Sequence, residues 1–114
     1  MKIVALLLAL GCAQYSWAHG EHPPQVAKCQ KAKACTESEV LAGAESAIKL
    51  IAAKDPSKAS FASVKPSKAE LRDFAKGKEW VATFNSESQP EGKKSLFVFI
   101  TQDGYLNGSN FTGK

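Results

Sequence analysis

Two histidines, His19 and His22, are the first candidates for chemistry, and they are the only histidines in the 114-residue chain. If the chain is cleaved after Ala18, the free amine and the imidazole of His19 can chelate one metal ion. His22 then supplies a third nitrogen, and three nitrogen ligands suit Cu(II) best. The sequence therefore suggests copper as a cofactor, against the simpler interpretation that a His-Gly start only suits the peptidase and solubility.

Cys29 and Cys35 form the second candidate pair. They are the only cysteines left if the segment that contains Cys12 is removed, and an even count in an oxidising compartment favours a disulfide. Closing so small a loop stabilises the fold by about 2 kcal/mol at most, so we expect the loop to lie outside the core. The alternative is a redox or soft-metal site, because neighbouring lysines favour thiolates.

The sequence contains no recognisable catalytic arrangement. No histidine follows His22, which excludes Ser-His-Asp and Cys-His catalysis in the domain that follows. The acidic residues fall singly among lysines, as on a solvated surface, so no carboxylate dyad is indicated. The net charge is +4, but its lysines are scattered and Arg72 is the only arginine, which argues against nucleic-acid binding. We therefore predict that the protein is not an enzyme.

Residues 1–18 have the pattern of a signal peptide. Lys2 precedes an apolar run over Ile3–Leu10, which is too short to span a bilayer, and small residues stand at 16 and 18. We therefore expect a periplasmic or secreted protein, cleaved after Ala18, with no stable membrane span. The alternative is a lipoprotein attached through Cys12.

The remaining chain divides into two parts. Residues 19–35 carry histidines, prolines and lysines but almost no large apolar side chain, which predicts a flexible tail. Residues 36–114 form the folded domain. Thr36 and Glu39 fit a capping box, and apolar residues then recur at three- and four-residue spacing as far as Ile51. This pattern predicts an amphipathic helix that ends before Pro56.

After the helix, the apolar pattern alternates as in β-strands. One strand is expected around 80–84, and a second over Ser95–Thr101, whose two apolar faces predict a central position in the sheet. A tight turn leads to a third strand over Tyr105–Phe111. Around Ala69–Phe74 we favour a further strand, although residue propensities there also permit a helix. The prediction is an α+β fold, with one amphipathic helix packed on a three- or four-stranded antiparallel sheet.

This layout resembles the small bacterial PepSY-like domains over about Ser38 to Phe111, because a helix precedes a meander whose last hairpin reads Phe-Val-Phe-Ile-x-x-Asp-Gly-Tyr. The start His-Gly-Glu-His, the strand opening Lys-Glu-Trp-Val and the ending Asn-Phe-Thr-Gly-Lys resemble a small family of periplasmic proteins of unknown function. The PepSY resemblance implies a binding or inhibitory module, often directed at secreted proteases. The cysteine pair is not part of the PepSY pattern.

The function that we predict from the sequence is an exported, non-enzymatic module that recognises a protein or peptide partner. A sheet edge or an exposed aromatic face would make the contact. The alternative is a periplasmic copper-binding protein that uses His19 and His22. We expect five aromatic residues in the core, and any row of them that the helix leaves uncovered would become a partner surface: Trp80, Phe97, Phe99, Tyr105 and Phe111.

Overall fold

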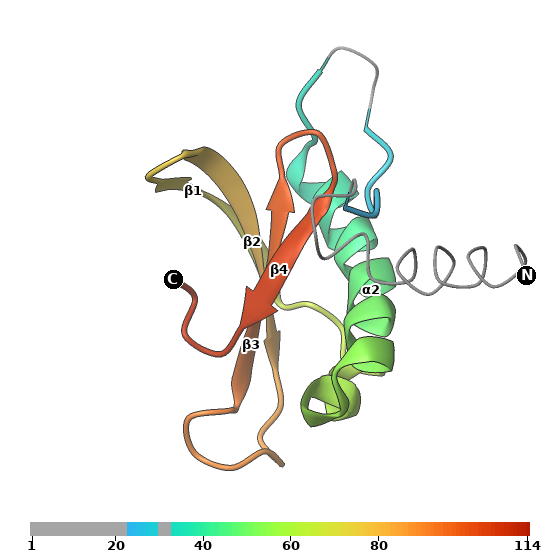
Figure 1. Ribbon diagram of the computed structural model, residues 1–114, viewed down its shortest axis with the longest axis vertical. Coiled ribbons are helices and arrows are strands. Elements are labelled where there is room, and N and C mark those ends of the chain that lie inside the picture. The colour runs from blue at the N-terminus through green and yellow to red at the C-terminus, as the bar shows by residue number, and fades with distance from the viewer. Residues whose placement is uncertain (1–22, 30–32) are drawn as a thin grey trace, which may run out of the picture.

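The computed structural model describes residues 23–29 and 33–114. Within them, one antiparallel sheet has the strand order β1-β2-β3-β4, and a long helix lies along one of its faces (Figure 1). This arrangement confirms the predicted α+β fold. The elements are helix α2 (Glu37–Lys54), the 3-10 helix η2 (Pro56–Phe61), and strands β1 (Lys68–Phe74), β2 (Gly77–Asn85), β3 (Ser95–Thr101) and β4 (Leu106–Asn110).

Helix α2 begins at the predicted capping box. The hydroxyl of Thr36 accepts a hydrogen bond from the backbone N–H of Glu39 at 3.3 Å, and the Glu39 carboxylate accepts one from the Thr36 N–H at 2.8 Å. These two bonds satisfy amides that have no partner within the helix. At the other end, the N–H of Asp55 donates to the carbonyl oxygen of Ile51 at 2.8 Å.

The 3-10 helix η2 was not predicted from the sequence. Asp55 caps it, because its carboxylate accepts from the N–H of Ser57 at 3.1 Å. Pro56 occupies the first position, where a missing N–H costs nothing. Phe61 at the end of η2 is fully buried, so tertiary packing stabilises an element whose local propensity is weak.

The hydrophobic core lies between α2 and the sheet. The apolar stripe of α2 is buried as predicted, at residues Val40, Ala44, Ala47, Ile48 and Ile51. The register pairs Ala82 with Val98 and Phe84 with Leu96, so each pair projects from one face of the sheet. All four side chains are fully buried in the core against α2.

None of the helices in the described ranges combines the length and the hydropathy that crossing a bilayer requires.

The segment before α2 packs on the domain over residues 23–29, which differs from the expectation of a flexible tail over 19–35. The N–H groups of Val26 and Ala27 donate to the carbonyl oxygen of Gly104 at 2.8 and 3.0 Å. In the other direction, the N–H of Leu106 donates to the carbonyl oxygen of Pro24 at 2.9 Å. Ala27 is only 2% exposed. Backbone hydrogen bonds and a small buried side chain order this segment, and composition reveals neither. Residues 19–22 lie outside the described residues.

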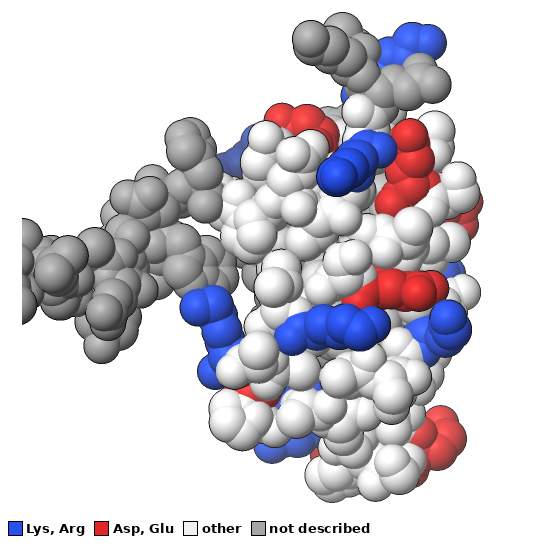
Figure 2. Space-filling view, turned by 90° about the vertical axis from the view of Figure 1, so that its right-hand side faces the viewer, with Lys and Arg blue, Asp and Glu red and all other residues white. Residues whose placement is uncertain are grey.

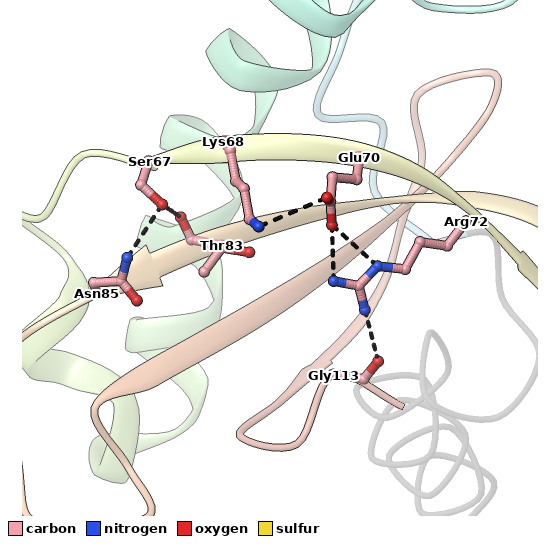
Figure 3. A network of polar contacts seen from close by, with 7 residues as sticks. All are labelled: Ser67, Lys68, Glu70, Arg72, Thr83, Asn85 and Gly113. Carbon is pink, nitrogen blue, oxygen red and sulfur yellow. Dashed lines mark hydrogen bonds and ion pairs between the residues drawn. The ribbon is translucent and has the colours of Figure 1, made fainter.

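The face of the sheet away from α2 is covered by the chain itself. Gly113 is buried with φ +78°, and a Cβ there would lie 3.3 Å from the ring of Phe97. Arg72 of β1 donates to the carbonyl oxygen of Gly113 at 3.3 Å (Figure 3). Phe74 meets Phe99 edge-on, with ring centroids 5.8 Å apart.

The five aromatic residues are therefore divided between the two faces of the sheet. Trp80 and Phe111 pack against the core, and Phe99 is 8% exposed on the opposite face. Phe97 and Tyr105 are half-buried. In the described chain, the C-terminal residues and the side chains of β1 cover much of the row that α2 leaves open.

Candidate binding groove

A groove of about 480 Å³ lies between the C-terminal half of α2 and strand β4. Leu50 forms part of its wall and is 42% exposed, whereas its neighbour Ile51 is buried. Backbone from β4 forms the opposite wall. The complete lining consists of Pro24, residues 50–51, residues 54–55, Lys58 and residues 106–109.

Charged side chains from the end of α2 and from η2 border this groove. The Nζ atom of Lys58 lies 3.3 Å from the carboxylate of Asp55, and it also donates to the hydroxyl and the carbonyl oxygen of Ser109, at 2.9 and 3.3 Å. A hydrogen bond from Ser57 holds the pKa of Asp55 below its usual value of 3.8, and Lys58 lowers this pKa further. Asp55 is therefore ionised at neutral pH, and Lys58 joins η2 to the edge of the sheet.

The outer edge of β4 is partly occupied. The carbonyl oxygen of Ser109 points toward Lys58, away from β3. Because the N–H and C=O of one residue in an antiparallel strand point to the same side, the Ser109 N–H also faces outward. Pro24 accepts from the N–H of Leu106 at the other end of β4. Between these two contacts, apolar side chains lie beside outward-facing backbone, which is the combination that peptide-binding sites use.

The predicted disulfide is present, with the Cα atoms of Cys29 and Cys35 4.9 Å apart. The expectation that its loop lies outside the core is not met at Cys35. This residue belongs to the core and is only 5% exposed. Its backbone N–H donates to the carbonyl oxygen of Gln102 at 2.8 Å. The carboxylate of Glu39 lies within 4.8 Å of both sulfurs. Because both sulfurs are in the disulfide, these three residues do not form a thiolate metal site.

The predicted copper ligands His19 and His22 lie outside the described residues. The groove, in contrast, was missed in the sequence. The residue from which the groove could have been predicted is Leu50, because it is a large apolar residue that lies outside the buried stripe of α2. Lys58 gave no signal, because its contact with Ser109 joins residues 51 positions apart.

These features define a small α+β domain with an apolar groove beside one sheet edge. The chain belongs to a family of unknown function, DUF6488, whose family model matches residues 1–114. This match supports the resemblance to a family of unknown function, and it carries no evidence for a PepSY domain. Neither a curated protein nor a solved structure matched the chain.

Proposed function

We propose that this protein is an exported, non-enzymatic module that binds a protein or peptide partner in the groove between α2 and β4. The observation that carries the proposal is the exposure of Leu50 in an apolar groove beside sheet backbone. The resemblance of the helix and meander to PepSY-like domains adds support, because those domains are binding or inhibitory modules. The signal-peptide pattern of residues 1–18 supports export, with a periplasmic or secreted destination.

The groove suits an extended peptide with one apolar side chain. Leu50 is 42% exposed, so covering it contributes on the order of 1 kcal/mol. A useful affinity therefore needs further contacts, which the edge of β4 offers through backbone hydrogen bonds. Gly108 in the groove wall has no side chain to obstruct a close approach.

The charge around the groove favours an acidic residue in the peptide. Lys54 and Lys58 border the groove with Asp55 as the one carboxylate. Basic side chains also lie on the α2 side of the molecule, with acidic side chains and uncharged surface between them (Figure 2). The chain as a whole has a formal net charge of +4, which favours anionic partners over cationic ones.

Selection from a random peptide library on the wild-type protein tests this function. The structure provides a matched pair of variants, Leu50→Asp in the groove and Leu71→Asp on β1, because each leucine is 42% exposed. We expect the enriched peptides to combine apolar and acidic residues. Calorimetry should show about a tenfold weaker affinity for Leu50→Asp, a loss of about 1.4 kcal/mol, and an unchanged affinity for Leu71→Asp. An equal loss in both variants, or no enriched peptide, would contradict the proposal.

A further inference from the structure

Strand β1 forms an open edge of the sheet. It is first in the strand order, and all its residues from Lys68 to Phe74 pair with β2 in one uninterrupted register. In the described part of the chain, no backbone group of β1 makes a hydrogen bond outside this ladder. An edge strand of seven residues therefore presents unsatisfied N–H and C=O groups.

Two of the devices that normally block such an edge, a proline and a β-bulge, are missing from β1. The strand contains no proline, and its register with β2 has no bulge. At the opposite edge, Pro24 and Lys58 contact β4. Charged side chains can also protect an edge by repulsion, but β1 has two cations and two anions, so its formal charge is zero in a chain of net charge +4. Its charges do not repel a strand of the same sequence.

We propose that β1 pairs antiparallel with β1 of a second copy of this chain, centred on Leu71. In this register Glu70 lies opposite the partner's Arg72, and Arg72 lies opposite the partner's Glu70. Each such pair of opposite charges across an antiparallel ladder stabilises the pairing of the two strands. The two sheets then join into one continuous sheet with a twofold axis at Leu71.

The charges of β1 select this register over its neighbours. A shift of two residues in one direction places Glu70 opposite the partner's Glu70 and Lys68 opposite the partner's Arg72. A shift of two residues in the other direction places Arg72 opposite the partner's Arg72. Both shifts bring like charges together, which is destabilising, and a shift of one residue moves every side chain to the wrong face.

Contacts within one chain hold the charged side chains of Glu70, Arg72 and Lys68 together on one face of β1, where they can reach a second strand. Glu70 accepts from the Nη2 and Nε atoms of Arg72 at 2.9 and 3.2 Å, and the Nζ atom of Lys68 lies 3.6 Å from its other oxygen (Figure 3). The hydrogen bond from Arg72 lowers the pKa of Glu70, and the charge of Lys68 lowers it further. Glu70 is therefore ionised at neutral pH. The Glu70 and Arg72 side chains project from the face opposite to Leu71 and extend the charge network across the joint.

Leu71 provides the apolar part of the contact. It is one of two large hydrophobic residues that are exposed in the described chain. Its side chain projects from the same face of the sheet as Ala69, which is buried in the core. Pairing about Leu71 brings the two leucines side by side and removes both from water. The groove lies at the β4 edge, so a dimer formed through β1 leaves both grooves open.

Charge reversal tests this dimer in the full mature chain by sedimentation velocity. We expect the wild type to dimerise, and Glu70→Arg and Arg72→Glu each to dimerise at least about tenfold more weakly, because each places like charges opposite one another. An equimolar mixture of the two variants should form a heterodimer, since Arg at 70 and Arg at 72 of one chain then face Glu at 72 and Glu at 70 of the other. The ion pair within each strand stays broken in this mixture, so a local effect on folding cannot produce the rescue.

Two further variants keep the interpretation unambiguous. The double variant E70R/R72E restores both opposite-charge pairs and should dimerise like the wild type. Lys94→Glu breaks an exposed ion pair with Glu87, in the connector between β2 and β3, and should leave dimerisation unchanged. A monomeric wild type at millimolar concentration would overturn the proposal. It would also be overturned by single variants that dimerise normally, or by a mixture of folded variants that fails to associate.

Discussion

Ala27 lies against Gly43 of helix α2 so closely that a Cβ atom on Gly43 would stand 2.7 Å from the Cβ of Ala27. Gly104, in the turn between β3 and β4, meets Ala27 as well, because a Cβ there would overlap the carbonyl oxygen of Ala27. The segment over residues 23–29 is thus held between the helix and the hairpin. Glycine is required at both positions because Ala27 approaches the backbone there so closely that no space remains for a side chain.

The first prediction concerns the sign of a stability change at Gly43. In an exposed helix interior, Gly→Ala stabilises a protein by about 1 kcal/mol. Because the segment before α2 occupies this space, we expect Gly43→Ala to destabilise the protein instead, and Ala27→Gly to reduce the loss in the double variant. Chemical denaturation of the four proteins measures this coupling. A stabilising Gly43→Ala would show that the segment is not packed on α2.

The second prediction concerns the disulfide. Cys35 is 5% exposed in the core, whereas Cys29 is only partly buried. Either substitution loses the loop constraint, worth about 2 kcal/mol. Cys35→Ser also buries a hydroxyl group in the core, so we expect it to cost about 1 kcal/mol more than Cys29→Ser. Equal free energies of unfolding for the two variants in urea would contradict the burial of Cys35.

Local patterns in the sequence predicted most of the fold. The capping box at Thr36 and the two apolar faces of Ser95–Thr101 depend on neighbouring residues, and both were confirmed. The strand favoured over Ala69–Phe74 was also confirmed, with β1 beginning one residue earlier. Short-range patterns suffice for such elements because capping and side-chain alternation are local properties.

The features that were missed depend on contacts between distant residues. Ala27 is buried because Gly43 and Gly104 leave space for it, and composition alone marked its segment as flexible. Two residues of the groove lining, Lys58 and Ser109, are joined by a hydrogen bond although they are 51 positions apart in the sequence. No short-range pattern identifies such partners, although the off-stripe position of Leu50 was a usable signal.

The third prediction concerns acid stability. The pKa of Asp55 is held below 3.8, first by the hydrogen bond from Ser57. A carboxylate with a lowered folded-state pKa stabilises the protein at higher pH, and this contribution is lost as the pH falls through the folded pKa. We expect Asp55→Asn, which keeps a capping oxygen, to melt below the wild type at neutral pH and to approach it below about pH 4.

Melting temperatures across a pH series measure this effect. Ser57→Ala removes the hydrogen bond from the Ser57 hydroxyl to the Asp55 carboxylate, which is the largest cause of the lowered pKa of Asp55, and keeps the bond from the backbone N–H. The stability of this variant should therefore depend less on pH than that of the wild type. If the difference between the wild type and Asp55→Asn is the same at every pH, the charge of Asp55 does not contribute to stability.

The fourth prediction concerns copper. A chain that begins at His19 should bind one Cu(II) through the amine and imidazole of His19, with His22 as the third ligand. The ligands must be deprotonated, so affinity should fall as the pH drops through the imidazole range. An extra glycine before His19 keeps both imidazoles but moves the amine, and it should weaken binding in a copper titration. Equal affinity for the native and the extended start would exclude the N-terminal chelate.

Peptide binding in the groove is measured most directly by titrating the isotope-labelled protein with an enriched peptide and following its amide resonances by NMR. We predict that the largest shifts occur at Leu50, Gly108 and Ser109, which line the groove, while resonances of β1 around Leu71 stay unchanged. Shifts that centre on β1 or on the face covered by Gly113, with the groove resonances unmoved, would contradict the proposed function.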